Sequence, residues 1–232
     1  MLLGITRPPE QLKGIDSFLK EKGVELIPLP VTSINYLDFQ LPVDYKLNEI
    51  DWIFFSSANG VRAFFKRLNN LKFSLDLRTK LAAVGDITGE ILDSYNQSVD
   101  FIPTKSYGKA LFEQFINEKA KENEVVIYAR AKSISFDPSE LFAQKSISYI
   151  PVNCYETVEQ NLSPEQLVNF KKSDKILFTA ASTVTFFQKQ HGQPKAKPIA
   201  IGKSTASEMI KQGWSDFITM EKPDIKSVLE YL

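Results

Sequence analysis

The sequence predicts an α/β protein made of two similar lobes, each with a parallel sheet flanked by helices, and a cleft between the lobes. Two observations carry this prediction. Residues 51–64 recur at 174–187, an offset of 123 residues, with six of the fourteen positions identical. Short apolar runs also alternate with helical patterns along the chain, which is typical of parallel βα units.

Composition limits the classes of function. The chain has 232 residues, enough for two lobes of about 110 each. Its 28 basic and 28 acidic residues cancel, and a nucleic-acid-binding protein normally has a basic excess, so we expect no nucleic-acid partner. The single cysteine, Cys154, excludes an internal disulfide, and the single histidine leaves little for a transition-metal site. His191 lies in a polar stretch after a predicted helix, where we expect a solvated loop.

No targeting or membrane-spanning segment is evident. The N-terminal apolar run is broken by Arg7 and Pro8, which does not fit a signal peptide. No window approaches the roughly 18 apolar residues of a membrane span. We therefore expect a cytoplasmic protein that does not bind membranes.

Strands are expected where short apolar runs occur. These runs are apolar throughout rather than alternating, as in strands covered by helices on both faces. In chain order, the predicted strands are 2–6, 25–29, 52–55, 80–84, 98–102, 125–128, 148–152, 175–178, 198–201 and 217–219.

Helices are expected after most of these strands. Apolar residues recur with helical spacing in 11–22, and Gly23 suits the end of that helix. The helix predicted near the C-terminus is followed by Gly213 in the same way. The full set of predicted helices is 11–22, 59–68, 88–95, 109–121, 139–144, 182–190 and 205–212.

Proline marks two predicted crossings between lobes. Pro28-Leu-Pro30 ends the second strand run, and Ile150-Pro151 ends its repeat partner. Because proline is poorly tolerated inside a central strand, both strands are expected to leave their sheets there. If each crossing passes to the other lobe, the first lobe contains both chain ends and the second is a central insert.

Loops that follow the strands are the candidate binding elements, because ligands of open parallel sheets lie beyond the carboxyl ends of the strands. Hydroxyls and free backbone N–H groups at the start of a helix suit anions. Simple helix capping is the alternative explanation for Ser57, Asn59, Ser182 and Thr183. The first repeated loop pair contributes the candidates Ser56, Ser57, Asn59, Gly60, Thr179, Ser182 and Thr183.

A second repeated loop pair begins with Gly85 and Gly202. Each glycine is expected to allow a sharp turn, and the following threonine to open the helix. Neither copy contains the dinucleotide or Walker A pattern, so we predict a pocket for a phosphate- or carboxylate-sized anion. This pair contributes Gly85, Thr88, Lys203, Ser204 and Thr205, and a further loop before a helix contributes Ser106, Tyr107 and Gly108.

Three larger side chains complete the candidates. Arg7 and Arg130 are paired by the repeat and follow strands. Each suits bidentate binding of a carboxylate, or else a surface ion pair. Tyr155 follows the second crossing and is expected near the junction of the lobes, where either packing or catalysis would explain it.

These motifs together resemble the uroporphyrinogen-III synthase family over nearly the whole chain. Their order and spacing are more specific than any one of them. The resemblance is carried by Thr6-Arg-Pro8, Phe55 to Val61, Ala83-Val-Gly85 with Thr88, Pro103 to Gly108 with Leu111, Tyr155-Glu-Thr157, Phe178 to Val184, and Ala200 to Ala206 with Gly213.

The resemblance implies two α/β lobes joined by a two-stranded connector, with the active site between them. The first lobe would comprise 1–32 and 157–232, the second 36–150, and the connectors about 33–35 and 151–156. The implied reaction closes hydroxymethylbilane, a linear tetrapyrrole with eight carboxylates, into uroporphyrinogen III, with loss of water and inversion of the D ring. No cofactor or metal is implied, and we expect a monomer.

Individual roles also follow from the resemblance. Tyr155 matches the family tyrosine proposed to assist departure of the substrate hydroxyl, and Thr88 and the 203–205 turn match substrate-binding positions. Two departures concern single contacts. Ala180-Ala181 stands where a serine-proline pair is often found, so the 179–183 loop is expected to rely more on backbone N–H groups. Gly89 replaces the usual alanine after Thr88.

Two other classes of function compete with the enzyme. A non-catalytic two-lobed binder of a small anionic metabolite, resembling periplasmic binding proteins, would favour a signal peptide and larger lobes. A regulatory module derived from the synthase would favour additional fused domains. Neither feature is evident, so we expect the synthase.

Overall fold

A computed structural model describes residues 1–40 and 49–232; residues 41–48, part of the predicted second lobe, lie outside the described residues. The chain divides into two compact units. Unit 1 comprises Met1–Ser33 and Val158–Leu232, and unit 2 comprises Ile34–Thr157. Both boundaries fall within strands, β3 (Thr32–Tyr36) and β7 (Ser148–Glu159). The cleft between lobes and the connector boundaries stay predictions.

Unit 1 contains a five-stranded parallel sheet in the order β10-β9-β8-β1-β2. Its strands are β1 (Leu2–Ile5), β2 (Glu25–Pro28), β8 (Lys175–Phe178), β9 (Lys197–Ala200) and β10 (Ile218–Thr219). Its helices are α1 (Ile15–Lys20), α6 (Pro164–Lys172), α7 (Ala181–His191) and α8 (Lys203–Lys211), with the 3-10 helices η1 (Pro9–Gln11) and η3 (Ile225–Tyr231).

Both faces of the unit 1 sheet are covered, which explains its uniformly apolar strands. In β8, Ile176 and Phe178 pack with residues of α7 and α8, whereas Leu177 packs on the opposite face with residues of α1 and η3. Successive strand residues point to opposite faces, so each face needs apolar side chains.

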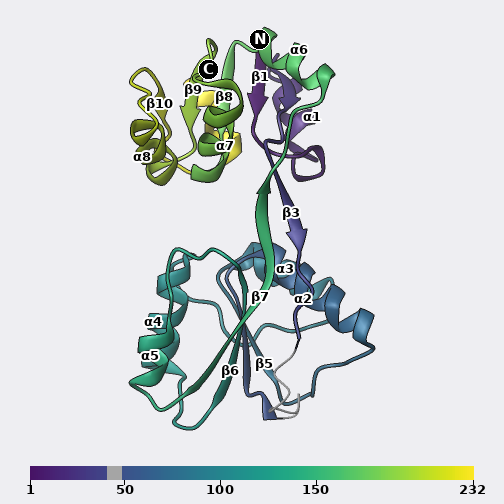
Figure 1. The fold of residues 1–232 in the computed structure, drawn as a ribbon, viewed down its shortest axis with the longest axis vertical. Coiled ribbons are helices and arrows are strands. Elements are labelled where there is room, and N and C mark those ends of the chain that lie inside the picture. The colour runs from purple at the N-terminus through teal and green to yellow at the C-terminus, as the bar shows by residue number, and fades with distance from the viewer. Residues whose placement is uncertain (41–48) are drawn as a thin grey trace. The chain divides into compact units, whose positions relative to one another are not determined.

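Unit 2 has a second five-stranded sheet, in the order β3-β7-β6-β4-β5; β4 to β7 are parallel, and β3 runs antiparallel to β7 at the edge. Its remaining strands are β4 (Trp52–Phe55), β5 (Lys80–Ala83) and β6 (Val125–Ala131), and its helices are α2 (Ala58–Leu71), α3 (Asp86–Asp93), α4 (Gly108–Glu118) and α5 (Ser139–Ala143). Helices α2 and α3 lie on one side of the sheet and α4 and α5 on the other (Figure 1). In β4, Ile53 and Phe55 pack toward the first side and Trp52 and Phe54 toward the second.

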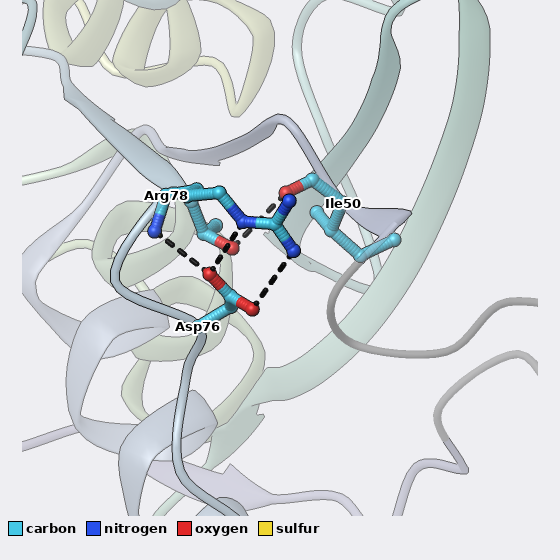
Figure 2. Close-up of polar contacts among 4 residues, drawn as sticks. Ile50, Asp76 and Arg78 are labelled. Carbon is cyan, nitrogen blue, oxygen red and sulfur yellow. Dashed lines mark hydrogen bonds and ion pairs between the residues drawn. The ribbon is translucent and has the colours of Figure 1, made fainter.

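The turn before β5 is held by a local polar cluster. Arg78 donates from Nε to one oxygen of Asp76 at 3.1 Å and from Nη2 to the other at 3.2 Å (Figure 2). Thr79 Oγ1 donates to the carbonyl of Ile50 at 3.0 Å. These bonds fix the approach of the chain to β5.

Some predicted elements were wrong. Residues 98–102 form no strand; Phe101 makes only an isolated bridge to Ala82. The helix predicted at 11–22 is split into η1 and the shorter α1. Helix α6 was missed, although its capping box was readable: Ser163 Oγ accepts from Gln166 N at 3.2 Å, and Gln166 Oε1 accepts from Ser163 N at 2.8 Å.

The two proline predictions had different outcomes. Strand β2 ends at Pro28, on the edge of its sheet, as predicted. Strand β7 does not end at Pro151 but continues to Glu159. Pro151 pairs with Tyr128 of β6. Strand β3 lies beside a later part of β7, and just after β3 Leu37 N donates to Cys154 O. Among the described strands, Pro151 therefore has a neighbour on one side only. The missing N–H of proline is tolerated at such an edge position.

Candidate functional site

The strand register brings the predicted loops of unit 2 to one edge of its sheet. Phe55, at the end of β4, pairs with Ala83 of β5 and with Ala129 of β6. All three strands are parallel, so the loops beginning at Ser56 and Val84 are neighbours of Arg130, near the end of β6. The predicted candidates of unit 2 therefore gather at the carboxyl edge.

At this edge, Ser57 is hydrogen-bonded to Tyr155. The Ser57 Oγ and Tyr155 OH lie 2.7 Å apart, and Ser57 Oγ also accepts from Gly60 N at 3.1 Å. The capping explanation for Ser57 is thus confirmed, and the same oxygen has a second partner. Tyr155 is 8% exposed and belongs to the core beside α2.

Burial sets the protonation state of Tyr155. It raises the pKa of the Tyr155 phenol, and the hydrogen bond from Ser57 opposes part of that rise. An ordinary tyrosine has a pKa of about 10. Tyr155 is therefore a neutral phenol at neutral pH and can act as a proton donor.

A similar pair joins Ser56 to Tyr128. The two hydroxyl oxygens are 2.6 Å apart, and burial raises the pKa of Tyr128. Sequence reasoning missed Tyr128. Little in the sequence selects Tyr128, because a tyrosine within an apolar strand is usually a core residue. Only the strand register places it beside Ser56.

Gly60 allows α2 to approach β6 closely. A Cβ at this position would lie 2.8 Å from the backbone oxygen of Ala129. Asn59 precedes it, inside α2 and half-buried, and the N-cap is Ser57. Capping is therefore not the role of Asn59.

The glycine of the second loop has a different role from the predicted one. Gly85 is extended, with φ 176° and ψ 176°, a conformation open to any residue. A Cβ on it would lie 2.8 Å from Ser106 Oγ, so the glycine permits close approach of the two loops. Helix α3 opens at Asp86 rather than at Thr88, which is buried in the first turn. Tyr107, 51% exposed, is the N-cap residue of α4, and Gly108 begins that helix.

Arg130 makes contacts within unit 2. Its Nε donates to Asn153 Oδ1 at 3.0 Å, and its Nη1 lies 3.6 Å from Asp137 Oδ2 and 3.5 Å from Tyr149 OH. The ion-pair interpretation therefore holds for Arg130.

In unit 1 the corresponding edge is organised by Thr6. This residue is 1% exposed, and its Oγ1 accepts from Thr179 N at 3.1 Å and lies 3.1 Å from Thr183 Oγ1. The hydroxyl of Thr179 donates to Thr6 O, and that of Thr183 to Ala180 O. Thr179 and Thr183 thus use their hydroxyls to shape the loop, and neither caps α7.

Arg7 differs from its repeat partner Arg130. Burial lowers the pKa of the Arg7 guanidinium, which still remains charged at neutral pH. No acidic residue of the described chain forms an ion pair with it. A partly desolvated, unpaired cation of this kind favours an anionic ligand.

The first turn of α8 presents the other candidates of unit 1. Lys203 and Ser204 are exposed at its start, whereas Thr205 is 1% exposed and its Oγ1 has no hydrogen-bond partner among the described residues. Gly202 before them is extended, not turned, and the helix begins at Lys203 rather than Thr205. Ser182 is half-buried in the first turn of α7.

His191 is not in a solvated loop, contrary to our expectation. It ends α7 and packs against Phe187 and Phe170, with ring centroids 5.0 and 5.5 Å away. Burial lowers its pKa. Within the described ranges, no group of three His, Cys, Asp or Glu residues could hold a metal ion, and no helix is long and apolar enough to cross a membrane.

The geometry defines an α/β protein whose two sheets, parallel except for β3, end in loops rich in hydroxyl and backbone N–H donors. The chain belongs to the family described as uroporphyrinogen-III synthase HemD, whose model matches residues 15–230. The resemblance found in the sequence is therefore confirmed, as is the α/β fold with helix-flanked parallel sheets.

Individual relatives agree. The porphyrin biosynthesis protein HemD of Ruminiclostridium josui is 29% identical over 98% of this chain, which spans only 47% of that protein. A putative uroporphyrinogen-III synthase of Methanocaldococcus jannaschii is 27% identical over 94% of this chain and 92% of its own length.

Solved structures support the fold. The uroporphyrinogen-III synthetase of Helicobacter pylori has a TM-score of 0.67 at 22% identity, covering 99% of this chain and 96% of its own. A mutant uroporphyrinogen III synthase of Thermus thermophilus has a TM-score of 0.59 at 16% identity, and the match covers 100% of this chain and 96% of that one.

Proposed function

We propose that this protein cyclises hydroxymethylbilane to uroporphyrinogen III. The family assignment supports this activity, and the observation that carries it is the hydroxyl pair of Ser57 and Tyr155, 2.7 Å apart at the carboxyl edge of a parallel sheet. The substrate has a hydroxyl that must leave as water. A buried neutral phenol at a ligand-binding edge is suited to donate the proton.

The proton balance assigns separate roles to the pair. Ser57 Oγ already accepts a hydrogen bond from Gly60 N, so its own proton is available to the phenol oxygen of Tyr155. In that arrangement the phenol proton is free for the substrate hydroxyl. The C–O bond then breaks, water departs, and the pyrrole nitrogen supplies the electrons that form an azafulvene.

Ring closure then depends on positioning. A substituted carbon of the D-ring pyrrole attacks the electrophilic azafulvene carbon to form a spiro intermediate, which reopens and recloses with the D ring inverted. The proton released from the D ring at the final closure restores the phenol of Tyr155. No further redox partner is needed, since one water is the net loss. Holding the chain in the folded geometry can contribute several kcal/mol without a strong nucleophile.

The substrate carboxylates account for the remaining candidates. We assign Arg7, the first turn of α8 and the loops at Ser56 and Gly85 to carboxylate binding. Each charge-assisted hydrogen bond contributes about 1.5–3 kcal/mol. Arg7 is the strongest single candidate because it is partly buried without an ion-pair partner in the described chain. We further propose a monomer without nucleic-acid partners.

Tyr155→Phe tests the proton-donor role. The substitution should lower kcat at least about 100-fold, the usual contribution of general acid catalysis, while removing only one hydrogen bond from the fold. Tyr231→Phe is the matched control. The hydroxyl of Tyr231, at the end of η3, accepts a hydrogen bond from Glu221 N at 3.0 Å, so this variant also loses one hydrogen bond, outside the candidate site. Full activity of folded Tyr155→Phe enzyme would remove Tyr155 from the mechanism.

A further inference from the structure

A cationic hollow lies on α2, apart from the loops that the sequence singled out. Its volume is about 330 Å³, within the range of small-ligand sites. All its residues belong to unit 2. We call it the α2 hollow; it is lined by Tyr36, Arg62, Lys66, Asn69, Asn70 and Tyr95.

The α2 hollow has two positive charges and no lining carboxylate. Arg62 and Lys66 are four residues apart in the helix, which places them on the same face with Cβ atoms about 5–6 Å apart. Neither has an ion-pair partner among residues 1–40 and 49–232, whereas the adjacent Arg67 is paired with Asp38 at 2.9 Å. The hollow is therefore suited to an anion.

The other lining groups suit a flat ligand with polar substituents. Lys66 Nζ lies 5.0 Å from the ring centroid of Tyr36, and Tyr95 stacks on Phe65 at 5.0 Å. Asn69 and Asn70 add amide donors. The combination of aromatic edges, amides and two cations favours an aromatic polycarboxylate over a simple inorganic ion.

The hollow is connected to the Ser57–Tyr155 pair through β3 and α2. Leu37 N donates to Cys154 O and Gln160 N to Val31 O, so β3 and β7 run antiparallel with Tyr36 opposite Tyr155. Directly opposed residues point to the same face of a sheet. Ser57 caps α2 and Arg62 follows five residues later, about 7.5 Å along the helix axis.

We propose that the α2 hollow binds the two carboxylates of one pyrrole ring of the substrate. This inference rests on the proposed function, whose substrate carries eight carboxylates on four rings, two for each ring. Two cations one helical turn apart match two carboxylates on adjacent ring carbons. A ring held between Arg62 and Lys66 would lie about 7.5–13.5 Å along α2 from Ser57, the hydrogen-bond partner of the proposed proton donor, within the span of a tetrapyrrole.

The double variant Arg62→Gln/Lys66→Gln tests the proposal. Kinetics with hydroxymethylbilane generated in situ should show KM raised about tenfold or more and kcat within about twofold, since ground-state binding is lost. Lys119→Gln/Lys121→Gln is the matched control, because it removes the same charge from unit 2 outside the hollow. Wild-type KM should also rise with ionic strength more steeply than that of the double variant.

Direct binding adds a second readout. Uroporphyrin III carries two carboxylates on each ring and coproporphyrin III only one, so the wild type should prefer the former and Arg62→Gln/Lys66→Gln should lose most of that preference. Arg62→Lys/Lys66→Arg should keep it. If circular dichroism shows the double variant unfolded, the two single Gln variants replace it, each with about threefold weaker binding expected.

The outcomes separate this inference from the proposed function. If the wild type produces no uroporphyrinogen III, the proposed function fails. If the wild type produces it and the double variant matches the Lys119→Gln/Lys121→Gln control in KM and porphyrin preference, the function stands and the α2 hollow is not a carboxylate subsite. A loss confined to kcat would likewise contradict the subsite.

Discussion

Gly60 and Gly89 sit early in two helices of unit 2 but have different surroundings. A Cβ at Gly60 would lie 2.8 Å from the Ala129 carbonyl oxygen. Relieving this contact would require a shift of the backbone, which costs free energy. A Cβ at Gly89 would meet only side chains of Val99 and Ile102 at 3.5 Å, an ordinary contact distance. The sequence pattern treats both as helix glycines, and only the structure separates them.

Gly60→Ala should therefore destabilise the protein, by about 1–3 kcal/mol for an overpacked site. Gly89→Ala should stabilise it by about 0.5–1 kcal/mol, because alanine loses less backbone entropy in a helix. Urea unfolding of both variants checks the opposite signs. A neutral or stabilising Gly60→Ala would contradict the close packing of α2 on β6.

The hydroxyl partners mark the limit of prediction at the residue scale. Ser57 and Tyr155 were both candidates from the sequence, but their hydrogen bond joins residues 98 positions apart. Thr6 and Tyr128 were not candidates at all. Each lies at or within an apolar strand, and its partner is decided by strand order, which local spacing does not encode.

At the scale of elements, one wrong prediction led to another: missing α6 led to the wrong prediction for His191. Helix α6 was missed because its apolar stripe is weak, and Phe170 on that helix is one of the two rings that cover His191. Because α6 was not predicted, His191 in its polar stretch was expected to be solvated. Strand β3 was expected only as a connector because its residues, Thr32 to Tyr36, are mostly polar and part-exposed.

The covered position of His191 predicts a pH dependence of stability. Burial lowers its pKa in the folded state, so the unfolded chain, with a pKa of about 6.5, binds more protons between the two values. The free energy of unfolding should therefore fall as the pH drops below about 6.5. His191 is the only histidine, so few other groups titrate there.

His191→Gln should remove this part of the dependence. Urea unfolding at several pH values between about 7.5 and about 5.5 compares how steeply the free energy of unfolding changes with pH in the two proteins. Parallel slopes for the wild type and the variant would show that His191 titrates alike in the folded and unfolded states.

At the scale of the whole molecule, the internal repeat predicted two α/β units, and each observed unit has its own sheet and its own cores. The core clusters of unit 2 contain only residues between Ile34 and Thr157, and those of unit 1 draw on both chain ends. Repeated motifs reveal such a division because each copy must bury its own apolar faces.

A fragment of residues 32–159, which retains β3 and all of β7, should therefore fold alone. Near-UV circular dichroism and cooperative urea unfolding should both report a packed core. A fragment without a cooperative transition would show that unit 2 depends on unit 1 for its stability, despite having separate cores.

The most direct test of the central claim is the isomer composition of the product. The purified protein is given hydroxymethylbilane generated in situ, the products are oxidised, and the type I and type III uroporphyrins are separated by chromatography. We expect type III to dominate, because the protein must favour the spiro route over spontaneous head-to-tail closure. Type I alone, formed at the spontaneous rate in the presence of folded protein, would contradict the synthase activity.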